Sequence, residues 1–348
     1  MSGTSLDGID IAYCTIIKDS NWQFKIDFAE TFPYSSSWMN VLREAIDLDH
    51  ESLQLLDAKY SKFLGNVIKT FMEKHNIINV DFVASHGHTV RHRPDLGYTY
   101  QIGNKQELAD ACNLKVISDF RGQDVKLGGQ GAPLVPIGDK LLFSNYDFCL
   151  NLGGFANISY EHNGERLAFD ICPANLVLNY FVSKLQLDFD NKGNIAASGQ
   201  LHRPLLDELN AIPFYSTLPP KSLGLEWVKE HFFPIVEAYD LKTKDVLRTL
   251  VEHIAVQIAR VTNTASTNTL VTGGGAFNEF LISRISNLSL TEMVLPNSEV
   301  IEYKEALIFA FLGVLRERNE INCLKSVTGA QQDHSSGRVL YPNPKIND

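Results

Sequence analysis

Long apolar runs and leader-like segments are absent from this sequence, and each absence argues against a class of protein. No apolar run approaches the roughly 20 residues that a bilayer-spanning helix needs. No basic segment followed by an apolar stretch stands near the start, so we expect no secretory signal peptide. Both features predict a protein that does not sit in a membrane.

Cysteine is scarce and unpatterned. The cysteines are odd in number, and no two have CxxC spacing. Because disulfides are rare in the cytosol, we interpret them as reduced, mostly buried thiols of a cytoplasmic protein. The five residues are Cys14, Cys112, Cys149, Cys172 and Cys323.

Basic residues are too few for a surface that binds polyanions. The chain has 31 Lys and Arg against 41 Asp and Glu, a net charge of -10. That balance disfavours nonspecific binding to nucleic acid or to an anionic membrane. The chain also lacks a GxxxxGK[ST] nucleotide loop. A phosphorylated ligand would therefore depend on local backbone dipoles and a metal ion.

The sequence does contain a large apolar fraction in alternating strand-like and helix-like segments. Hydrophobic residues make up 44% of 348 residues, which predicts two domains and an α/β fold class. We expect a loop over 122–131 and a loosely held tail over 333–348. The expected strands are 9–17, 24–32, 80–84, 115–118, 147–152, 157–160, 166–169 and 270–272, and the expected helices are 53–71, 105–112, 174–185, 244–261, 278–285 and 303–318.

The first of three glycine loops opens the chain. Gly3 and Gly8 allow tight turns and a close approach to a ligand. The hydroxyl and N–H groups of Ser2, Thr4 and Ser5 are of the kind that cradle phosphate oxygens. The Asp7 carboxylate is suited to a hydrated Mg²⁺ ion. The alternative is a frayed chain end.

Two further glycine loops follow strand-like runs, where α/β sheets bind ligands. One is Gly153-Gly154 and the other is Gly273-Gly274-Gly275. Asn278 lies near the cap of the next predicted helix, whose N–H groups and dipole favour an anion. Each loop alone could serve only a tight turn, but three in one α/β chain favour a shared ligand that carries phosphate.

Asp170 is the candidate general base. It closes a strand-like run and precedes a helix that Pro173 initiates. Apolar neighbours would raise its pKa toward neutrality. The alternative is a helix N-cap, for which Asp is a common choice.

Two polar segments accompany the predicted strands. The first carries His86, His88 and His92, for which we favour a hydrogen-bonding lining over a zinc site because no Cys or carboxylate lies nearby. The second carries Arg121, whose planar fork suits a carboxylate or a sugar oxygen. A surface ion pair of Arg121 with Asp119 or Asp124 is the alternative.

A series of longer motifs runs along the chain in the order SGTSLDGID, SHGHTVRHRP, YTYQIGN, SDFRGQDVKLGGQGAPLVP, NLGGFANIS, FDICPAN, KSLGLEW, VTGGGAFN, KEALIFAFLG and VTGA. Together they resemble the anhydro-N-acetylmuramic acid kinase family. The resemblance implies the fold of the sugar kinase, actin and Hsp70 superfamily, with two ribonuclease-H-like domains around an ATP cleft. It places domain I over 1–128 plus 302–348 and domain II over 129–301.

The same resemblance implies an ATP-dependent enzyme that uses Mg²⁺ and acts in cell-wall recycling. It would open 1,6-anhydro-N-acetylmuramic acid with water and phosphorylate O6, giving N-acetylmuramate 6-phosphate. Asp170 would be the catalytic base, Asp7 the metal-associated carboxylate, and a homodimer is possible. The sugar would be bound by Arg121, Glu305, His86 and Asn175, and ATP by Gly3, Thr4, Ser5, Gly8, Gly153, Gly154, Gly273, Gly274, Gly275 and Asn278. For Glu305, a favourable acid in a first helical turn is the alternative.

The chain departs from the family pattern in three places. Asp170-Ile171-Cys172-Pro173-Ala174-Asn175 replaces an Asp-Thr-Gly-Pro-Gly-Asn loop, so Ile171 or Cys172 could narrow the sugar pocket. His88 stands where Gln is usual. The family has a strand before the SGTS loop, so we expect either an upstream start or a shortened strand from Ile9. The alternatives are therefore a kinase for another amino sugar and a nucleotide-binding module that has lost phosphotransfer.

Overall fold

The computed structural model describes residues 1–3 and 6–344, and the packing of the chain divides it into two units. Unit 1 comprises Met1–Leu142 and Tyr303–Asp348, and unit 2 comprises Phe143–Glu302. The first boundary thus falls at residue 142, whereas the sequence analysis placed it at 128. Helix α5 (Pro136–Leu142) stays with unit 1 because Asp139 forms a buried ion pair of 2.7 Å with Lys304.

Unit 2 is built on one five-stranded sheet with the order β11-β10-β7-β8-β9. Strands β7, β8 and β9 form an antiparallel meander, and β10 runs parallel to both β7 and β11. A meander extended by parallel strands on its first edge is the ribonuclease-H-like arrangement that the family resemblance implied. The strands are β7 (Phe148–Leu152), β8 (Phe155–His162), β9 (Glu165–Pro173), β10 (Asn268–Thr272) and β11 (Glu292–Val294).

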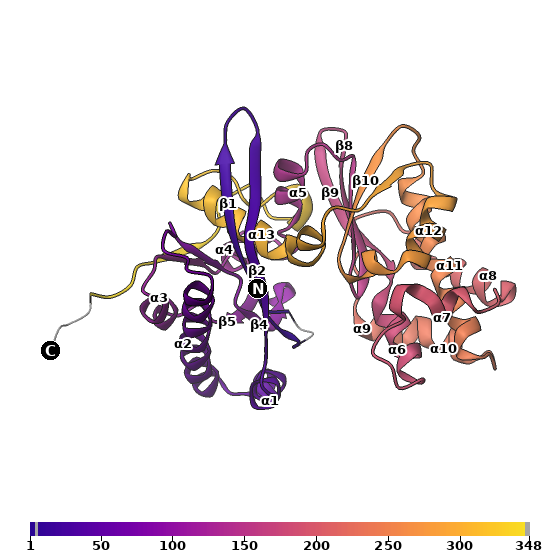
Figure 1. Cartoon of the computed structure of the whole chain (residues 1–348), viewed down its shortest axis with the longest axis horizontal. Coiled ribbons are helices and arrows are strands. Elements are labelled where there is room, and N and C mark those ends of the chain that lie inside the picture. Colours follow the sequence, from indigo (N-terminus) through magenta and orange to yellow (C-terminus); the bar gives the residue numbers. More distant parts are fainter. Residues whose placement is uncertain (4–5, 345–348) are drawn as a thin grey trace. The chain divides into compact units, whose positions relative to one another are not determined.

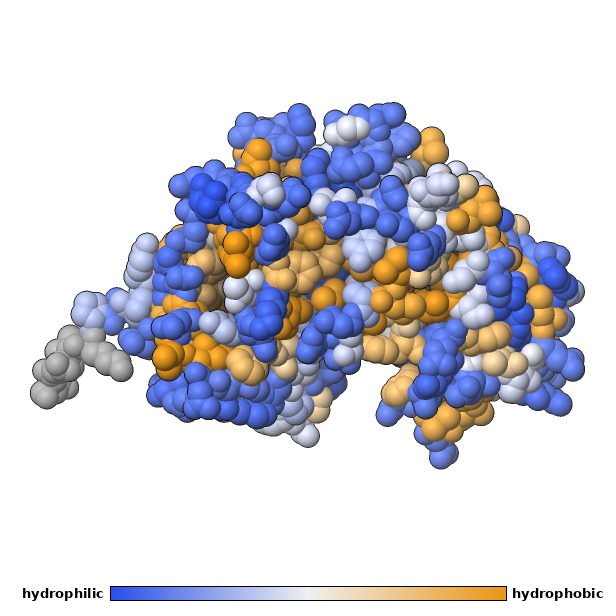
Figure 2. Space-filling model, turned by 45° about the horizontal axis from the view of Figure 1, so that its top comes forward, coloured by the Kyte–Doolittle hydropathy of each residue, from blue (hydrophilic) through white to orange (hydrophobic). Residues whose placement is uncertain are grey.

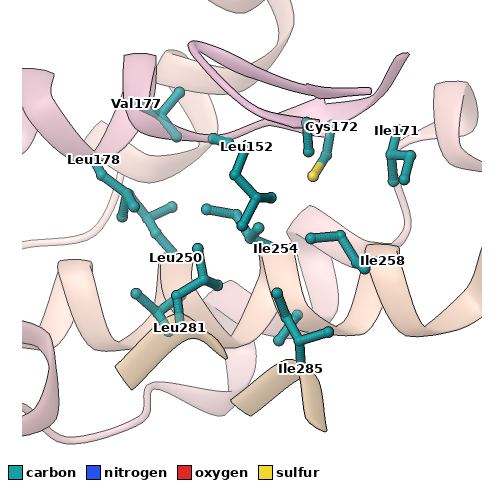
Figure 3. Packing of buried hydrophobic residues seen from close by; sticks show 14 of the residues in the cluster. Leu152, Ile171, Cys172, Val177, Leu178, Leu250, Ile254, Ile258, Leu281 and Ile285 are labelled. Carbon is teal, nitrogen blue, oxygen red and sulfur yellow. The ribbon is translucent and has the colours of Figure 1, made fainter. Parts of the chain in front are cut away.

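The core of unit 2 lies between this sheet and its helices. Leu152 from β7 and Cys172 from β9 point at Ile254 and Ile258 of α11 (Thr243–Thr262), as Figure 3 shows. The side chains of all four are buried, and this burial stabilises the sheet and the helix together. The other helices of unit 2 are α6 (Asn175–Ser183), α7 (Asn194–Ala197), α8 (Arg203–Asn210), α9 (Leu225–Trp227), α10 (Phe233–Glu237) and α12 (Glu279–Leu288).

Unit 1 distributes its strands over smaller sheets. Strands β1 (Gly8–Lys18) and β2 (Trp22–Pro33) form a long antiparallel hairpin, whose turn projects beyond the neighbouring elements of this unit in Figure 1. A second sheet has the order β12-β6-β3, and β4 pairs with β5. These strands are β3 (Val83–Ser85), β4 (His88–Arg93), β5 (Tyr98–Ile102), β6 (Val116–Ser118) and β12 (Arg338–Leu340).

A cavity of about 290 Å³ lies between the β1-β2 hairpin and the β12-β6-β3 sheet of unit 1. Its walls include Ile11 of β1, Val83 of β3, Phe71 of α2 (His50–Lys74) and Ala310 of α13 (Ser298–Glu317). The remaining helices of this unit are α1 (Ser36–Glu44), α3 (Gln106–Cys112), α4 (Gly122–Lys126) and α14 (Lys325–Thr328). The β1-β2 hairpin and the β12-β6-β3 sheet therefore line one cavity of mixed polar and apolar character without pairing with each other.

Two expectations about unit 1 are wrong. The predicted loop over 122–131 begins with helix α4, because Val125 N–H bonds to Arg121 O and closes a helical turn. The predicted loose tail is ordered as far as the structure describes it. Its strand β12 pairs with β6, and the side chain of Ser336 is buried and donates to Phe120 O at 2.7 Å.

The surface matches the composition. Figure 2 shows a mostly hydrophilic face on which hydrophobic residues gather in several patches. All five cysteines are free thiols, and four of them are buried. Among the described residues, no helix has the length and apolar character to span a bilayer.

Candidate functional site

Asp170 lies within strand β9, at a β-bulge. Ala156 of β8 pairs with Cys172, but the next residue, Asn157, pairs with Asp170. Ile171 is thus the extra residue on β9. A bulge of this kind turns side chains out of the regular alternation, and such bulges are common beside active sites. The strand continues to Pro173, so Asp170 is not at the strand end that the sequence suggested.

The Asp170 carboxyl is held by the segment that follows the 3₁₀ helix η4 (Pro213–Ser216). Leu223 N–H donates to Asp170 Oδ2 at 2.8 Å, and Asp170 N–H donates to Lys221 O at 3.2 Å. Burial raises the pKa of Asp170, and the Leu223 hydrogen bond partly opposes that rise. The helix-cap alternative is excluded, because the N-cap of α6 is Ala174 and Asp170 is four residues earlier. Asp170 is a carboxyl with enhanced basicity on a rigid strand.

The second and third glycine loops meet at the carboxyl ends of β7 and β10, which are parallel neighbours. Gly273 has a φ of +81°, and a Cβ there would lie 2.6 Å from Asn151 Oδ1. This position therefore requires glycine for both its backbone angle and its packing. Gly154 and Gly274 are exposed, so the backbone of both loops is accessible from solvent. The arrangement suits the close approach of a ligand.

Two asparagines brace these loops. Asn175 Nδ2 donates to Leu152 O at 3.0 Å, which ties the start of α6 to the end of β7. The N–H of Asn175 also donates to Gly153 O at 3.1 Å. Asn278 is the N-cap of α12, and its side-chain oxygen accepts from Leu281 N–H at 3.0 Å. The predicted cap is thus confirmed, and it occupies the Asn278 carbonyl oxygen.

Arg121 and His86, which belong to two different sequence motifs, are in contact in unit 1. Arg121 Nε donates to His86 Nε2 at 2.9 Å, and Arg121 Nη1 donates to Gly131 O at 2.6 Å. Since Nε2 accepts, Nδ1 of His86 carries the proton and donates to Gly87 O at 3.0 Å. Burial and the nearby guanidinium hold the pKa of His86 well below its usual range. His86 is therefore a neutral support for a charged, half-buried arginine.

The ion-pair alternative for Arg121 does not hold. Asp119 Oδ1 accepts from Gly122 N–H at 3.1 Å, and Asp124 Oδ2 accepts from Gly131 N–H at 2.7 Å. Both carboxylates are therefore engaged by backbone groups of their own loop. Within the described residues, the arginine fork is positioned by a histidine and a carbonyl, which leaves its positive charge to attract an anion.

Glu305 lies on α13 in the electrostatic range of Arg121. The residue as a whole is exposed, but the surrounding atoms desolvate its carboxyl, and this desolvation raises the pKa of Glu305. The Arg121 guanidinium opposes that rise. Glu305 is in the third turn of α13, which begins at Ser298, so the alternative of an acid in a first helical turn is wrong. Arg121 and Glu305 therefore influence each other electrostatically.

The first glycine loop is anchored through Ser2. Its Oγ lies 2.7 Å from Tyr34 OH and 3.0 Å from His88 Nδ1, and all three groups are buried. A Cβ on Gly8 would lie 2.7 Å from Phe32 O, so this glycine is required by strand pairing. The Asp7 side chain is exposed. Gly3 is exposed as well, whereas Thr4 and Ser5 lie outside the described residues.

The His88 side chain has two structural partners, Ser2 and Tyr60. The ring of His88 is buried against Ser2 and stacks edge-on with Tyr60. Burial lowers its pKa to about 4. The only group of metal-ligating side chains found in the described part of the chain lies elsewhere in unit 1 and does not include these histidines.

Comparison with known proteins decides the family. The family model described as anhydro-N-acetylmuramic acid kinase matches residues 1–342. The chain belongs to the anhydro-N-acetylmuramic acid kinase family. It is 33% identical to the protein of that name from Haemophilus influenzae, over 98% of this chain and 96% of the relative. It is 34% identical to the Zymomonas mobilis protein of that name, over 98% of each chain.

The similarity to solved structures is weak, with a TM-score of 0.33 in several cases. The activator of 2-hydroxyisocaproyl-CoA dehydratase from Clostridium difficile with bound ADPNP is 15% identical, with a TM-score of 0.33, over 50% of this chain and 61% of its own. A score this low bears on neither fold nor ligand. Family membership of this kinase thus rests on sequence.

Sequence reasoning missed the groups that position the site. The segment Lys221 to Leu223, which holds Asp170, was noticed as part of a motif but was assigned no role. The pairing of His86 with Arg121 was missed because the two residues are 35 positions apart in the chain. The only available signal was that both stand directly after predicted strands.

Proposed function

We propose that the protein is an ATP-dependent anhydro-N-acetylmuramic acid kinase. It opens 1,6-anhydro-N-acetylmuramic acid with water and phosphorylates O6, giving N-acetylmuramate 6-phosphate. The observation that carries the proposal is Asp170, a carboxyl of raised pKa held on a bulge in a chain of this kinase family. We further propose that it acts in the cytoplasm, as a homodimer.

Asp170 acts as the general base. It accepts a proton from the water whose oxygen bonds to the anomeric carbon, while the bond between that carbon and O6 breaks. The freed O6 attacks the γ-phosphorus of ATP, and ADP leaves with the bonding electron pair. Leu223 N–H on Oδ2 keeps the Asp170 carboxyl in a fixed orientation throughout. Burial, which raises the Asp170 pKa, is what strengthens this carboxylate as a proton acceptor.

The sugar is held by Arg121, Glu305, His86 and Asn175. Arg121 offers a positive charge to the carboxylate of the sugar's lactyl group, and a planar donor fork suits that partner. His86 fixes the Arg121 guanidinium before the sugar binds. Binding therefore loses less free energy to side-chain ordering than it would if Arg121 were free. Glu305 accepts from sugar hydroxyls, and Asn175 orients the loop beside Asp170.

The phosphates of ATP are bound by the glycine loops. These are Gly3 to Gly8, Gly153-Gly154 and Gly273 to Gly275, with Asn278 capping the helix behind the last of them. The exposed Asp7 carboxyl fits a hydrated Mg²⁺, because this ion keeps several waters and accepts one or two carboxylates. Bound magnesium would neutralise charge on the transferring phosphoryl group.

The altered loop after Asp170 gives little support to a different sugar. Ile171 is 3% exposed, and Cys172 and Ala174 are fully buried. Figure 3 shows Ile171 and Cys172 among the apolar side chains of unit 2. The two residues contribute to the core, so we no longer expect either to narrow a sugar pocket. A kinase for another amino sugar is retained only as an outcome of the assay.

The test is product formation from ATP, Mg²⁺ and 1,6-anhydro-N-acetylmuramate, followed by mass spectrometry of the sugar. A phosphorylated, ring-opened product is expected. Asp170→Asn should lower its rate by roughly 10²- to 10⁴-fold, the typical contribution of a general base. Asp188→Asn, at an exposed position of the same unit, is the matched control and should retain the rate.

Three results would change the proposal. A wild-type rate for Asp170→Asn would remove Asp170 from the chemistry. ATP binding without any product would favour a nucleotide-binding module. Phosphorylation of a different amino sugar in preference would reassign the substrate.

A further inference from the structure

A buried group of three metal-ligating side chains lies in unit 1, apart from the residues assigned to ATP and sugar. Asp124, Cys323 and His334 each offer one ligand atom, and these atoms lie within 4.8 Å of one another. The residues are 0%, 1% and 6% exposed. None of them has a role in the proposed kinase reaction.

Backbone pairing places Cys323 and His334 side by side. Cys323 N–H donates to His334 O at 3.1 Å, and His334 N–H donates to Cys323 O at 3.2 Å. Residues that exchange both hydrogen bonds are directly opposite in an antiparallel pair, and their side chains share one face. That face is turned toward Asp124, since the Cys323 thiol donates a hydrogen bond to Asp124 Oδ1 at 3.1 Å. Three distant parts of the chain therefore converge on one point.

The histidine is the observation that indicates a ligand. His334 Nδ1 lies 3.2 Å from Gln332 O, so this nitrogen carries the proton and Nε2 bears the lone pair. Nε2 is buried, finds no hydrogen-bond partner among residues 1–3 and 6–344, and faces Asp124 Oδ1 at 3.6 Å. A lone pair directed at a carboxylate oxygen is unfavourable unless a proton or a cation lies between them. A metal-ligating histidine typically donates its other N–H to a carbonyl in this way.

The distances suit zinc. Bond lengths of about 2.0–2.3 Å place the ligand atoms of a tetrahedral Zn²⁺ site roughly 3.3–3.7 Å apart. The distances of 3.1 Å and 3.6 Å to Asp124 Oδ1 lie close to that range. Thr328 Oγ donates a hydrogen bond to the same oxygen at 2.7 Å, and a water molecule would complete the coordination of a bound cation.

We propose that Asp124, Cys323 and His334 bind a thiophilic divalent cation of the zinc type. The Cys323 thiol releases its proton to solvent on binding, and its thiolate bonds to the metal, with no change of oxidation state. The site joins α4 to the C-terminal segment. Since Asp124 Oδ2 holds Gly131 N–H and Arg121 holds Gly131 O, the cation braces the loop that carries Arg121.

Cobalt substitution tests the site directly. The full chain is stripped of metal with a chelator in mild denaturant and refolded with one equivalent of Co²⁺. We expect a sulfur-to-cobalt charge-transfer band in the near ultraviolet and a higher melting temperature with Zn²⁺ than with chelator. Cys323→Ser should abolish the band, and Cys112→Ser, at another buried free thiol of unit 1, should retain it.

His334→Gln supplies a second reading if Cys323→Ser fails to fold. It should weaken Zn²⁺ binding by roughly 10-fold or more, because one of three protein ligands is lost. The absence of a charge-transfer band, a band that survives Cys323→Ser, or an equal loss in Cys112→Ser would overturn the proposal. In that case the three side chains form only a hydrogen-bonded cluster around Asp124.

Discussion

The two units use similar strands and helices but complete their sheets to different degrees. In unit 2 the order β11-β10-β7-β8-β9 is continuous, and α11 packs against the buried face. In unit 1, β1 and β3 belong to separate sheets, and a cavity of about 290 Å³ lies between them. A close-packed core transmits strain and resists change, whereas apolar walls around a void lack partner atoms. The same kind of substitution should therefore have different effects in the two units.

The two units also differ in how they position the candidate site residues. Unit 2 places Asp170 on a bulge of a complete sheet, so its carboxyl is held by strand pairing as well as by Leu223. Unit 1 positions Arg121 through side chains and short segments, namely His86, Gly131 and the cluster around Asp124. Rigid strands hold groups more accurately than loops do, so the Asp170 carboxyl should be oriented more precisely than the Arg121 guanidinium.

The largest contrast is expected from removing core side chains. Leu150→Ala, at a fully buried position of β7, should lower the free energy of unfolding by about 3–5 kcal/mol. Ile11→Ala, at a half-buried position beside the cavity, should cost no more than about 1–2 kcal/mol because fewer contacts are lost. Urea unfolding followed by circular dichroism measures both. Equal losses would mean that the void is filled in solution.

Low pH should reduce the stability of each unit, because a buried histidine in each binds a proton more readily when the unit is unfolded. Burial lowers the pKa of His88 in unit 1 to about 4 and that of His253 in unit 2 to about 3, from 6.5. The unfolded chain gains these protons below about pH 6.5, but the folded chain does not, so stability falls with pH from about 7 toward 4. For His88 the loss approaches roughly 3 kcal/mol at pH 4.

Substitution separates the two histidines. His88→Gln retains a hydrogen-bonding group beside Ser2 but does not titrate, so unit 1 should lose the part of its acid sensitivity that His88 contributes and keep the part that comes from His86. His253→Gln should do the same for unit 2. Melting temperatures at pH 7 and pH 5 provide the measurement. An unchanged difference between the two pH values in His88→Gln would contradict the assignment.

The smallest effect should come from adding volume, and its sign should differ between the units. Ala310→Leu directs extra methyl groups into the cavity and should stabilise unit 1 by about 1 kcal/mol. Ala255→Leu, at a fully buried position of α11, overpacks unit 2 and should destabilise it by about 1–3 kcal/mol. Differential scanning calorimetry of both variants makes this comparison. Destabilisation by both would show that the cavity walls cannot accommodate a larger side chain.

Much of the secondary structure followed from periodicity. The predicted helix over 53–71 lies inside α2, and the predicted strand over 9–17 lies inside β1, because long amphipathic or alternating patterns are strong local signals. The predicted strands over 157–160 and 166–169 lie inside β8 and β9, which pair through a turn in which Asn163 and Gly164 both have positive φ. The prediction from periodicity failed for short segments. Elements α4, β4 and β12 have too few residues for a periodic pattern to be recognised.

The sequence by itself determined the α/β class, the family and the residue types of the site, since these depend on local patterns and on long motifs in a set order. Only the tertiary structure decided which of those residues meet. His86 supports Arg121, Leu223 holds Asp170, and His334 faces Asp124, and in each pair the partners are far apart in the chain. Such pairs arise from sheet order and burial, which bring together groups that no spacing in the sequence relates.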